Sequence, residues 1–192
     1  MPYPVSAPRT SVQRPLAEAT KNVQAALAGG IIAIVYRKAD NATATPAEVV
    51  VRPAEVGDLP AIVALDAEAT GLAKPGYWKD RFAWYAGGQR GRYFLIAERN
   101  AESVGFIVGE VRAWEFGSPP SGWVFAINVK AEARLHGLGT VLFDELCARF
   151  RKAGARHVRT MLARDAQVIM SFFRSQGMMA GPFIQLEKQL AP

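Results

Sequence analysis

Two glycines between a predicted strand and a predicted helix constrain this chain more than any other feature of its sequence. The window V-F-A-I-N-V-K-A-E-A-R-L-H-G-L-G-T-V-L-F places Gly137 and Gly139 after an apolar, β-branched run and before an amphipathic one. The first main-chain N–H groups of a helix have no acceptor within the helix, and they carry the positive end of its dipole. We therefore expect this loop to bind an anion such as a phosphate.

The spacing of these glycines excludes two common nucleotide-binding motifs. A Walker A loop needs Gly-Lys-Ser/Thr, whereas Thr140 directly follows Gly139. A dinucleotide fingerprint needs a third glycine at the position that Leu142 occupies. The sequence instead spells Arg-x-x-Gly-x-Gly from Arg134 to Gly139.

Alternating strand and helix patterns predict an α/β fold with a mixed, mostly antiparallel sheet flanked by helices. Strands are expected at 49–52, 93–98, 103–114, 123–129, 157–163 and 183–190, and helices at 58–66, 77–85, 138–153 and 168–175. Asp58 is the expected N-cap of the first helix. Because the helix at 138–153 joins two strands of one sheet, we expect those strands to be parallel.

Residues 1–47 differ in composition from the rest of the 192-residue chain. They are Pro-rich, then Ala-rich, then apolar, and they end in the polar stretch A-D-N-A-T-A-T-P. We therefore divide the chain into a partly ordered or accessory N-terminal extension, 1–47, with one helix around 16–27, and a folded domain, 48–192.

The sequence favours a cytoplasmic protein without a transmembrane segment. The longest apolar run, 25–36, is shorter than the roughly 20 residues that span a bilayer. It resembles the apolar part of a signal peptide, but the segment before it is long and charged residues follow it. Cys147 is the only cysteine and there are two histidines, so we expect no disulfide and no metal site.

The Arg134 motif resembles the acetyl-CoA motif of the GCN5-related N-acetyltransferase (GNAT) superfamily, which is Gln/Arg-x-x-Gly-x-Gly/Ala at a strand-loop-helix junction. Four other segments resemble the family in the same order: V-R-P-A-E-V-G-D-L, V-G-F-I-V-G-E, I-N-V-K-A-E-A-R and F-F-R-S-Q-G-M. Together they cover about residues 48–190. The resemblance implies the GNAT acyl-CoA N-acyltransferase fold.

The resemblance also implies acetyl-CoA as the cosubstrate and direct transfer of the acetyl group to an amine. A β-bulge in the strand at 123–129 would open an edge for the pantetheine arm, and the amides of the glycine loop would hold the pyrophosphate. The implied CoA-binding residues are Ile127, Asn128, Val129, Arg134, Leu135, His136, Gly137, Leu138, Gly139, Thr140, Asp165 and Phe173.

The acid and base of the reaction are less clear in the sequence. The family often has a tyrosine as proton donor where Phe173 stands, and the strand at 123–129 has no carboxylate. Glu110 is our candidate for the base, acting directly or through water, with an exposed strand-end acid as the alternative. Asp165 is better explained as a helix N-cap, and Cys147 as a small buried hydrophobe.

The acceptor is an unidentified amine, either a protein α-amine or a small molecule. Because α-amino groups are partly neutral near pH 7, they suit a weakly equipped site better than lysine does. An aromatic set either lines the acceptor pocket or packs in the core, and its members are Tyr77, Trp78, Phe82, Trp84 and Tyr85.

The net charge of +6 favours anionic partners. A basic cluster at 149–174 contains Arg149, Arg151, Lys152, Arg156, Arg159, Arg164 and Arg174. It is either a cofactor or polyanion surface or a solvated helix face, and without a recognisable motif we do not expect nucleic acid as the partner. The sequence allows a homodimer. The main alternative function is a non-catalytic, acyl-CoA-binding or regulatory GNAT module.

Overall fold

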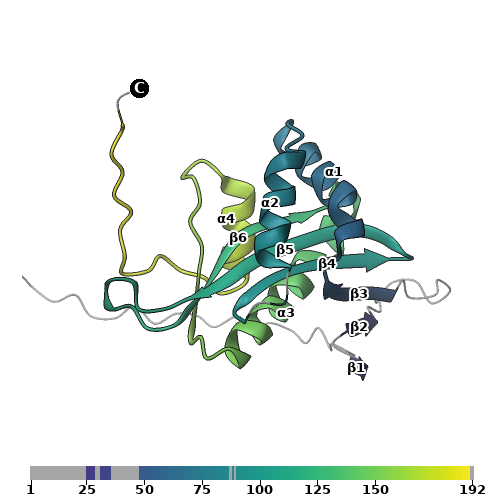
Figure 1. Cartoon of the computed structure of the whole chain (residues 1–192), viewed down its shortest axis with the longest axis horizontal. Coiled ribbons are helices and arrows are strands. Elements are labelled where there is room, and N and C mark those ends of the chain that lie inside the picture. The colour runs from purple at the N-terminus through teal and green to yellow at the C-terminus, as the bar shows by residue number, and fades with distance from the viewer. Residues whose placement is uncertain (1–24, 29–30, 36–47, 87, 89, 191–192) are drawn as a thin grey trace, which may run out of the picture.

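The computed structural model of the chain describes residues 25–28, 31–35, 48–86, 88 and 90–190. Within these residues, seven strands form one sheet in the order of the sequence, from β1 to β7 (Figure 1). Neighbouring strands are antiparallel except β6 and β7, which are parallel. The mixed, mostly antiparallel sheet and the parallel crossover that the sequence predicts are both confirmed.

The strands of the sheet are β1 Ala25–Ala28, β2 Ile31–Val35, β3 Glu48–Pro53, β4 Arg92–Arg99, β5 Glu102–Arg112, β6 Ser121–Val129 and β7 His157–Arg159. The helices are α1 Leu59–Thr70, α2 Pro75–Tyr85, α3 Leu138–Lys152 and α4 Gln167–Ser175. Three short 3-10 turns, Val56–Asp58, Glu115–Gly117 and Ala131–His136, lie between them. The expected helices and most of the expected strands agree with these bounds to within a few residues.

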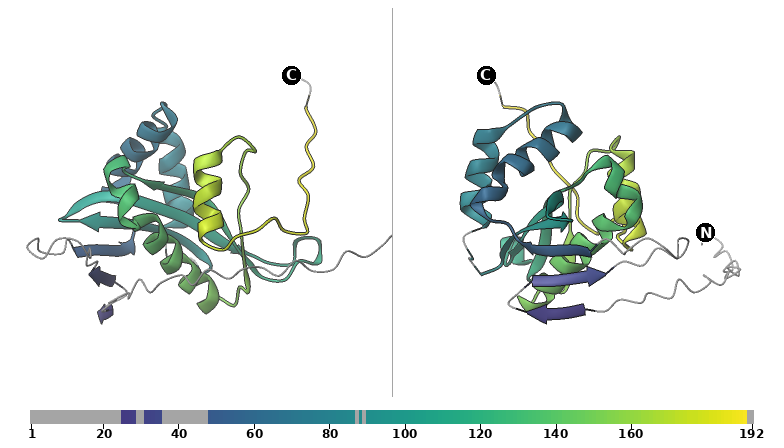
Figure 2. Two further views of the ribbon diagram at one scale, coloured as in Figure 1. Left: turned by 180° about the vertical axis from the view of Figure 1, so that it is seen from behind. Right: turned by 90° about the vertical axis from the view of Figure 1, so that its right-hand side faces the viewer.

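The sheet separates two hydrophobic cores, because alternate residues of a strand point to opposite faces. Leu95 and Ile107 point to the face covered by α3 and α4, where they pack around Leu142 and Phe150. Phe94, Phe106 and Val108 point to the other face, under α1 and α2. Figure 2 shows the two helix pairs on opposite sides of the sheet. This layering leaves the part of β6 that β7 does not pair as a place where a ligand can reach the main chain.

The region before residue 48 differs from the expectation where it is described. Residues 25–27 belong to β1 and not to a helix, and β2 pairs with β3, so this apolar run extends the edge of the sheet. The rest of the helix expected at 16–27 lies outside the described residues. The division at residue 48 stays a prediction.

The strand expected at 183–190 is wrong. Residues 178–190 form no helix or strand and leave the body of the protein as an extended segment (Figure 1). Ile184, Leu186 and Leu190 alternate as strand residues do, but their side chains are about four-fifths exposed. Alternation produces a strand only where a neighbouring strand and a buried face exist, and here neither is present among the described residues. The strand at 157–163 is also shorter than expected and ends at Arg159.

Asp58 precedes α1 as expected, but its side chain does not cap that helix. It accepts hydrogen bonds from the main-chain N–H of Glu55 and from Arg52. Asp165 also fails as a cap, because α4 begins after Ala166 and has no side-chain cap. Among the described residues, no helix is long and apolar enough to cross a membrane.

Candidate functional site

A β-bulge interrupts β6 in the middle of the sheet. Val108 of β5 is opposite Ala126, but the next residue, Gly109, is opposite Val124, so Phe125 is the extra residue. Such a bulge bends its strand and places the side chains of two successive residues on the same face. Phe125 and Ala126 therefore both point toward α2, while Val124 packs in the core under α3. The bulge that the family resemblance implies is present in the strand where it was expected.

Beyond the bulge, one edge of β6 has no neighbouring strand among the described residues. The pairing with β7 covers only 121–123, and Thr160 then donates a hydrogen bond of 3.0 Å to the Val124 carbonyl. Further along, the N–H of Lys130 points to β5, where it donates to Val104. Main-chain groups alternate along a strand, so the N–H and C=O of Ile127 point away from β5, toward the open edge. They are available to a ligand that lies along this edge.

A helix N-terminus follows this edge directly. Gly137 has φ 71°, the left-handed conformation that glycine adopts without strain, and α3 begins at the next residue. The N–H groups of Leu138, Gly139 and Thr140 are in the first turn, before the helical hydrogen bonds begin. A Cβ at Gly139 would lie 3.0 Å from the Phe172 ring, so only glycine leaves that ring in its place against the loop. This glycine-lined turn fits a diphosphate.

The residues that the sequence singled out for CoA use their side chains in different ways. Asn128 donates its amide to the Leu65 carbonyl, and the Arg134 Nε donates to the Val129 carbonyl at 2.9 Å. Leu138 is buried, so only its main chain can meet a ligand. The side chains of Asn128, Arg134 and Leu138 are therefore engaged within the fold, and the groups of this segment that stay available to a ligand are main-chain ones.

The remaining members of the set occupy varied environments. The hydroxyl of Thr140 accepts a hydrogen bond from the side-chain amide of Gln176. Asp165 is exposed, and Phe173 is 3 % exposed and packs edge-on against Phe143. The side chains of Leu135 and His136 lie outside the described residues.

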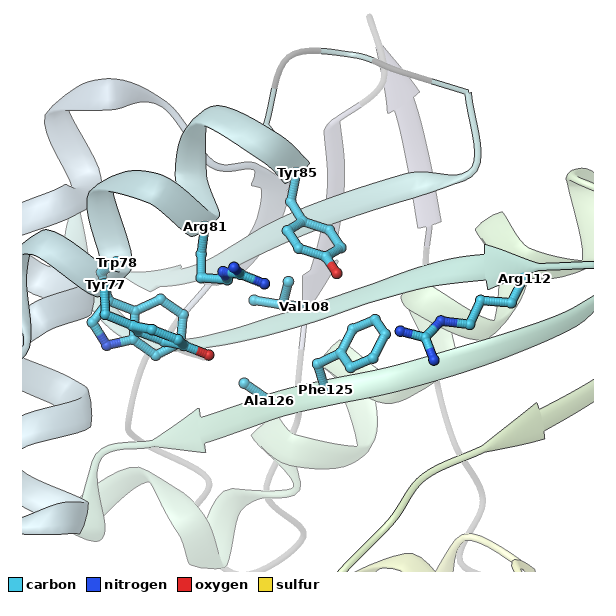
Figure 3. Close-up of a pocket in the computed structure, with 8 residues that line it drawn as sticks. All are labelled: Tyr77, Trp78, Arg81, Tyr85, Val108, Arg112, Phe125 and Ala126. Atoms are coloured by element: carbon cyan, nitrogen blue, oxygen red, sulfur yellow. The ribbon is translucent and has the colours of Figure 1, made fainter. Parts of the chain in front are cut away.

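A small cavity lies on the α2 face of the sheet, beside the bulge. It has a volume of about 110 Å³ and is shown in Figure 3. Its lining consists of Tyr77, Trp78, Arg81, Tyr85, Val108, Arg112, Phe125 and Ala126. Three members of the predicted aromatic set therefore line a cavity. Of the other two, Phe82 packs in the core under α2 and Trp84 is exposed, with the Arg92 guanidinium 3.9 Å from its ring centroid.

The wall of the cavity is held by a polar contact between α1 and α2. The Trp78 indole N–H donates a buried hydrogen bond of 2.8 Å to Asp66, and Lys74 pairs with the same carboxylate at 2.9 Å. The Trp78 ring also packs edge-on against Phe106 of β5, with centroids 5.0 Å apart. Aromatic rings on one rigid wall suit a flat or apolar group.

Glu110 lies at the same face, near the end of β5, and is engaged by several partners. Its carboxylate pairs with Arg112 at 2.8 Å and approaches Arg92 at 3.8 Å. It also lies close enough to the Tyr85 hydroxyl to influence the pKa of that group. Burial raises the pKa of the Tyr85 hydroxyl, and the nearby negative charge of Glu110 raises it further. Tyr85 therefore keeps its proton near neutral pH and links Glu110 to the cavity, which the carboxylate does not line.

Other residues that were weighed from the sequence lie away from these features. Cys147 is buried in α3, and burial raises the pKa of its thiol to about 11, which fits a structural role. In the basic cluster, Arg149 pairs with Glu145 on α3, and Arg159 donates to Ser118. No group of three potential metal ligands is found among the described residues.

The charged and aromatic lining residues Arg81, Arg112 and Phe125 were not singled out from the sequence. Arg81 is one of several charged residues in an amphipathic helix, and Arg112 and Phe125 fit an ordinary strand pattern, so the sequence does not distinguish them as site residues. The position of the bulge decides that Phe125 faces α2, and no turn residue marks that position. A signal for Arg81 did exist, because it lies four residues after Tyr77 and four before Tyr85 and so shares their helix face.

Comparisons with known proteins agree on one family. The sequence matches the model of the "Acetyltransferase (GNAT) family" over residues 59–178. No curated protein matches the sequence at a significant level.

Several solved structures share the fold at low sequence identity. An aminoglycoside N-acetyltransferase AAC(6')-Iy in complex with CoA has a TM-score of 0.67 at 13% identity, over 77% of this chain and 98% of that one. The aminoglycoside 6'-N-acetyltransferase AAC(6')-Ih from Acinetobacter baumannii has 0.64 at 15%, over 74% and 99%. A ribosomal-protein-alanine N-acetyltransferase from Brucella melitensis biovar Abortus 2308 has 0.61 at 16%, over 74% and 99%.

Proposed function

The chain belongs to the acetyltransferase (GNAT) family, and we propose that it transfers an acetyl group from acetyl-CoA directly to the nitrogen of an amine. The observation that carries the proposal is the open edge of β6 at Ile127. This edge lies between the N-terminal turn of α3 and the aromatic cavity that Ala126 lines. An anion site, a hydrogen-bonding edge and an acceptor pocket thus follow one another along the chain.

The roles of the residues follow from these positions. The N–H groups of Leu138, Gly139 and Thr140 would bind the diphosphate, each with a charge-assisted hydrogen bond of about 1.5 to 3 kcal/mol. The N–H and C=O of Ile127 would bind the pantetheine amides. When bound, acetyl-CoA would supply a thioester that an amine can attack. Asn128 and Arg134 would support this geometry by fixing β6 and its exit.

The proton of the amine would leave through Tyr85 to Glu110. Tyr85 lines the cavity and its hydroxyl lies close enough to Glu110 to feel the carboxylate charge, so it can take up the amine proton and release its own while it stays a neutral phenol. This assigns Glu110 an indirect role, because its carboxylate does not line the cavity. Phe173 has no hydroxyl and is buried, so it cannot donate a proton to the departing thiolate.

An acceptor amine that is already partly neutral near pH 7 would depend least on a general base in this site. The α-amino group of a peptide has a pKa of about 7.7 to 8.0, whereas that of lysine is about 10.4. We therefore expect faster transfer to α-amines than to lysine side chains. Faster transfer to lysine side chains in matched peptides would contradict this part of the proposal.

Two substitutions of Thr140 test the cofactor site. Thr140→Glu places a carboxylate in the first turn of α3, where it stabilises the helix but repels a phosphate. Thr140→Gln is the matched neutral control, and both variants lose the contact with Gln176. We expect calorimetry to show at least a tenfold loss of acetyl-CoA affinity for Thr140→Glu and less than a threefold loss for Thr140→Gln. Equal affinities in the two variants would overturn the proposed anion site.

The second candidate is a non-catalytic module that binds acyl-CoA. The buried Phe173 in place of a proton donor favours it. Release of free CoA thiol with a panel of amines distinguishes the two functions. Turnover supports the enzyme, whereas binding of acetyl-CoA without turnover for any amine supports the module.

A further inference from the structure

The charges around the aromatic cavity are unevenly distributed. Two of its lining residues are arginines, Arg81 from α2 and Arg112 from β5, and no lining residue is acidic. The nearest carboxylate, Glu110, is already engaged by Arg112 and Arg92. The cavity therefore carries an excess of positive charge.

Arg81 is the arginine whose guanidinium donors are available for a ligand. Its guanidinium lies 5.5 Å from the centroid of the Tyr77 ring, and it forms no ion pair with any described residue. Figure 3 shows it between the Tyr77 and Tyr85 rings, on the side of the cavity opposite Arg112. A guanidinium presents five N–H donors in a planar fork that matches a carboxylate. Most of these donors are free in Arg81.

The second arginine, Arg112, already uses one of its donors within the protein. Arg112 donates its Nε to Glu110, and its guanidinium lies 4.9 Å from the centroid of the Phe125 ring. Its side chain is 42 % exposed, so the terminal nitrogens stay accessible. Both arginines thus meet the cavity next to aromatic rings, Arg81 beside Tyr77 and Arg112 beside Phe125.

We propose that the acceptor is a small amine that carries a carboxylate, and that Arg81 is the residue that recognises this carboxylate. The inference rests on the proposed acetyl transfer and specifies its substrate class. A cavity of about 110 Å³ takes one small group, and its charge repels additional ammonium groups. Polycationic amines, the acceptors named for some structural neighbours, are therefore poor acceptors for this chain.

The test compares amines in pairs that differ only in charge. Glycine is paired with glycinamide, and L-phenylalanine with L-phenylalaninamide. Converting the carboxylate into an amide lowers the pKa of the neighbouring ammonium group, so a larger fraction of the amide is neutral at the assay pH, which favours the amide where charge is not recognised. We expect kcat/KM to be at least tenfold higher for at least one carboxylate than for its amide, and the polycation neamine to be slower than either. A preference for both amides, or for neamine, would overturn the proposal.

A matched pair of variants assigns the preference to Arg81. Arg81→Met removes the charge and keeps an apolar stem, and Lys79→Met removes one charge from an exposed position of the same helix that does not line the cavity. We expect the carboxylate preference to fall at least fivefold in Arg81→Met and to stay within twofold of the original in Lys79→Met. Equal loss in both variants would indicate general electrostatic attraction and contradict the assignment.

Failure of this inference can be told apart from failure of the proposed function. If no amine is acetylated, calorimetry with the same amine pairs is carried out on the full chain in the presence of CoA. Tighter binding of the carboxylates, lost in Arg81→Met, then supports the recognition site without catalysis. Equal binding or no binding of both members overturns the inference, whatever acetyl-CoA itself does.

Discussion

The side-chain amide of Asn128 donates a hydrogen bond of 2.7 Å to the main-chain carbonyl of Leu65, and it thereby ties β6 to α1. Asn128 follows the open edge of Ile127 by one residue, so the bond fixes the strand where a ligand would lie. The side chain is thus committed to the fold.

Removal of this bond is expected to cost stability more than affinity. Asn128→Ala should lower the free energy of unfolding by about 1 kcal/mol, the usual net contribution of such a bond. Asn128→Asp should lower it further at pH 7, because a carboxylate would face a carbonyl oxygen. Urea denaturation measures both, and acetyl-CoA affinity should stay within threefold in Asn128→Ala. A tenfold loss of affinity with unchanged stability would mean that the side chain binds the cofactor.

Two glycines under α3 should respond differently to the same substitution. A Cβ at Gly122 would overlap the Phe150 ring, whereas one at Gly109 would lie 2.7 Å from that ring and also 2.6 Å from the Trp123 carbonyl oxygen. We expect each alanine variant to lose about 1 to 3 kcal/mol or more by overpacking. Because a side chain can be shortened and a backbone cannot, Phe150→Leu should improve the stability of Gly122→Ala but not of Gly109→Ala. Thermal denaturation of the single and double variants checks this, and equal rescue of both would contradict it.

The Arg52–Asp58 ion pair makes the stability of the domain depend on pH. Burial acts to raise the pKa of Asp58, but hydrogen bonds from Arg52 and from the Glu55 N–H outweigh it, and the pKa lies below its ordinary value. A carboxylate with a lowered folded-state pKa stabilises the fold above its unfolded pKa of about 3.9. That stabilisation is lost as the pH falls from there toward the folded-state pKa.

Asp58→Asn tests this dependence. At pH 7 the variant should lose about 2 to 3 kcal/mol of unfolding free energy, because a charged bidentate contact is broken and, among the described residues, Arg52 keeps only Glu98 as an ion-pair partner. The difference from the original chain should shrink below pH 4. Asp80→Asn, at an exposed position of α2, is the control and should change stability by less than about 0.5 kcal/mol. A difference that does not vary with pH would contradict the assignment.

Local patterns in the sequence were enough to predict most of the fold. Helical spacing from Leu138 to Phe150 and the β-branched runs of β4 to β6 determine elements whose apolar faces are buried where they form. The segment at 183–190 has the same kind of pattern, but the side chains of Ile184, Leu186 and Leu190 are about four-fifths exposed. These segments differ in whether the folded protein offers a surface for their apolar residues to pack against. The local sequence of a segment does not show this.

The site was predictable in its main-chain part and less so in its side chains. The left-handed backbone of Gly137 and the close Phe172 ring beside Gly139 both favour glycine, and the two glycines are visible in the sequence. The positions of Arg81 and Arg112 around one cavity depend on how α2 crosses β5 and on the bulge at Phe125. Such relationships between distant segments have no local signature.

Cys147 should be protected from thiol reagents in the folded protein. Its side chain is 9 % exposed, and burial raises its pKa to about 11, so little thiolate is present at pH 8. We expect a coloured disulfide reagent to react at pH 8 only as fast as the protein unfolds, and at once in denaturant. Rapid labelling of the native protein with loss of acetyl transfer would place the thiol in the site.

The contact between Tyr85 and Glu110 provides the sharpest test of the proton path. If the proton reaches Glu110 through Tyr85, then Tyr85→Phe and Glu110→Gln should each lower kcat by about 10²-fold, and the double variant should be no slower. Tyr93→Phe, which removes a hydroxyl on the opposite face of the sheet, should keep kcat within twofold. Because burial and Glu110 raise the pKa of Tyr85, the pH profile of kcat/KM should show no tyrosine ionisation below pH 10. Multiplicative losses in the double variant, with equal losses of thermal stability, would instead assign both residues a structural role.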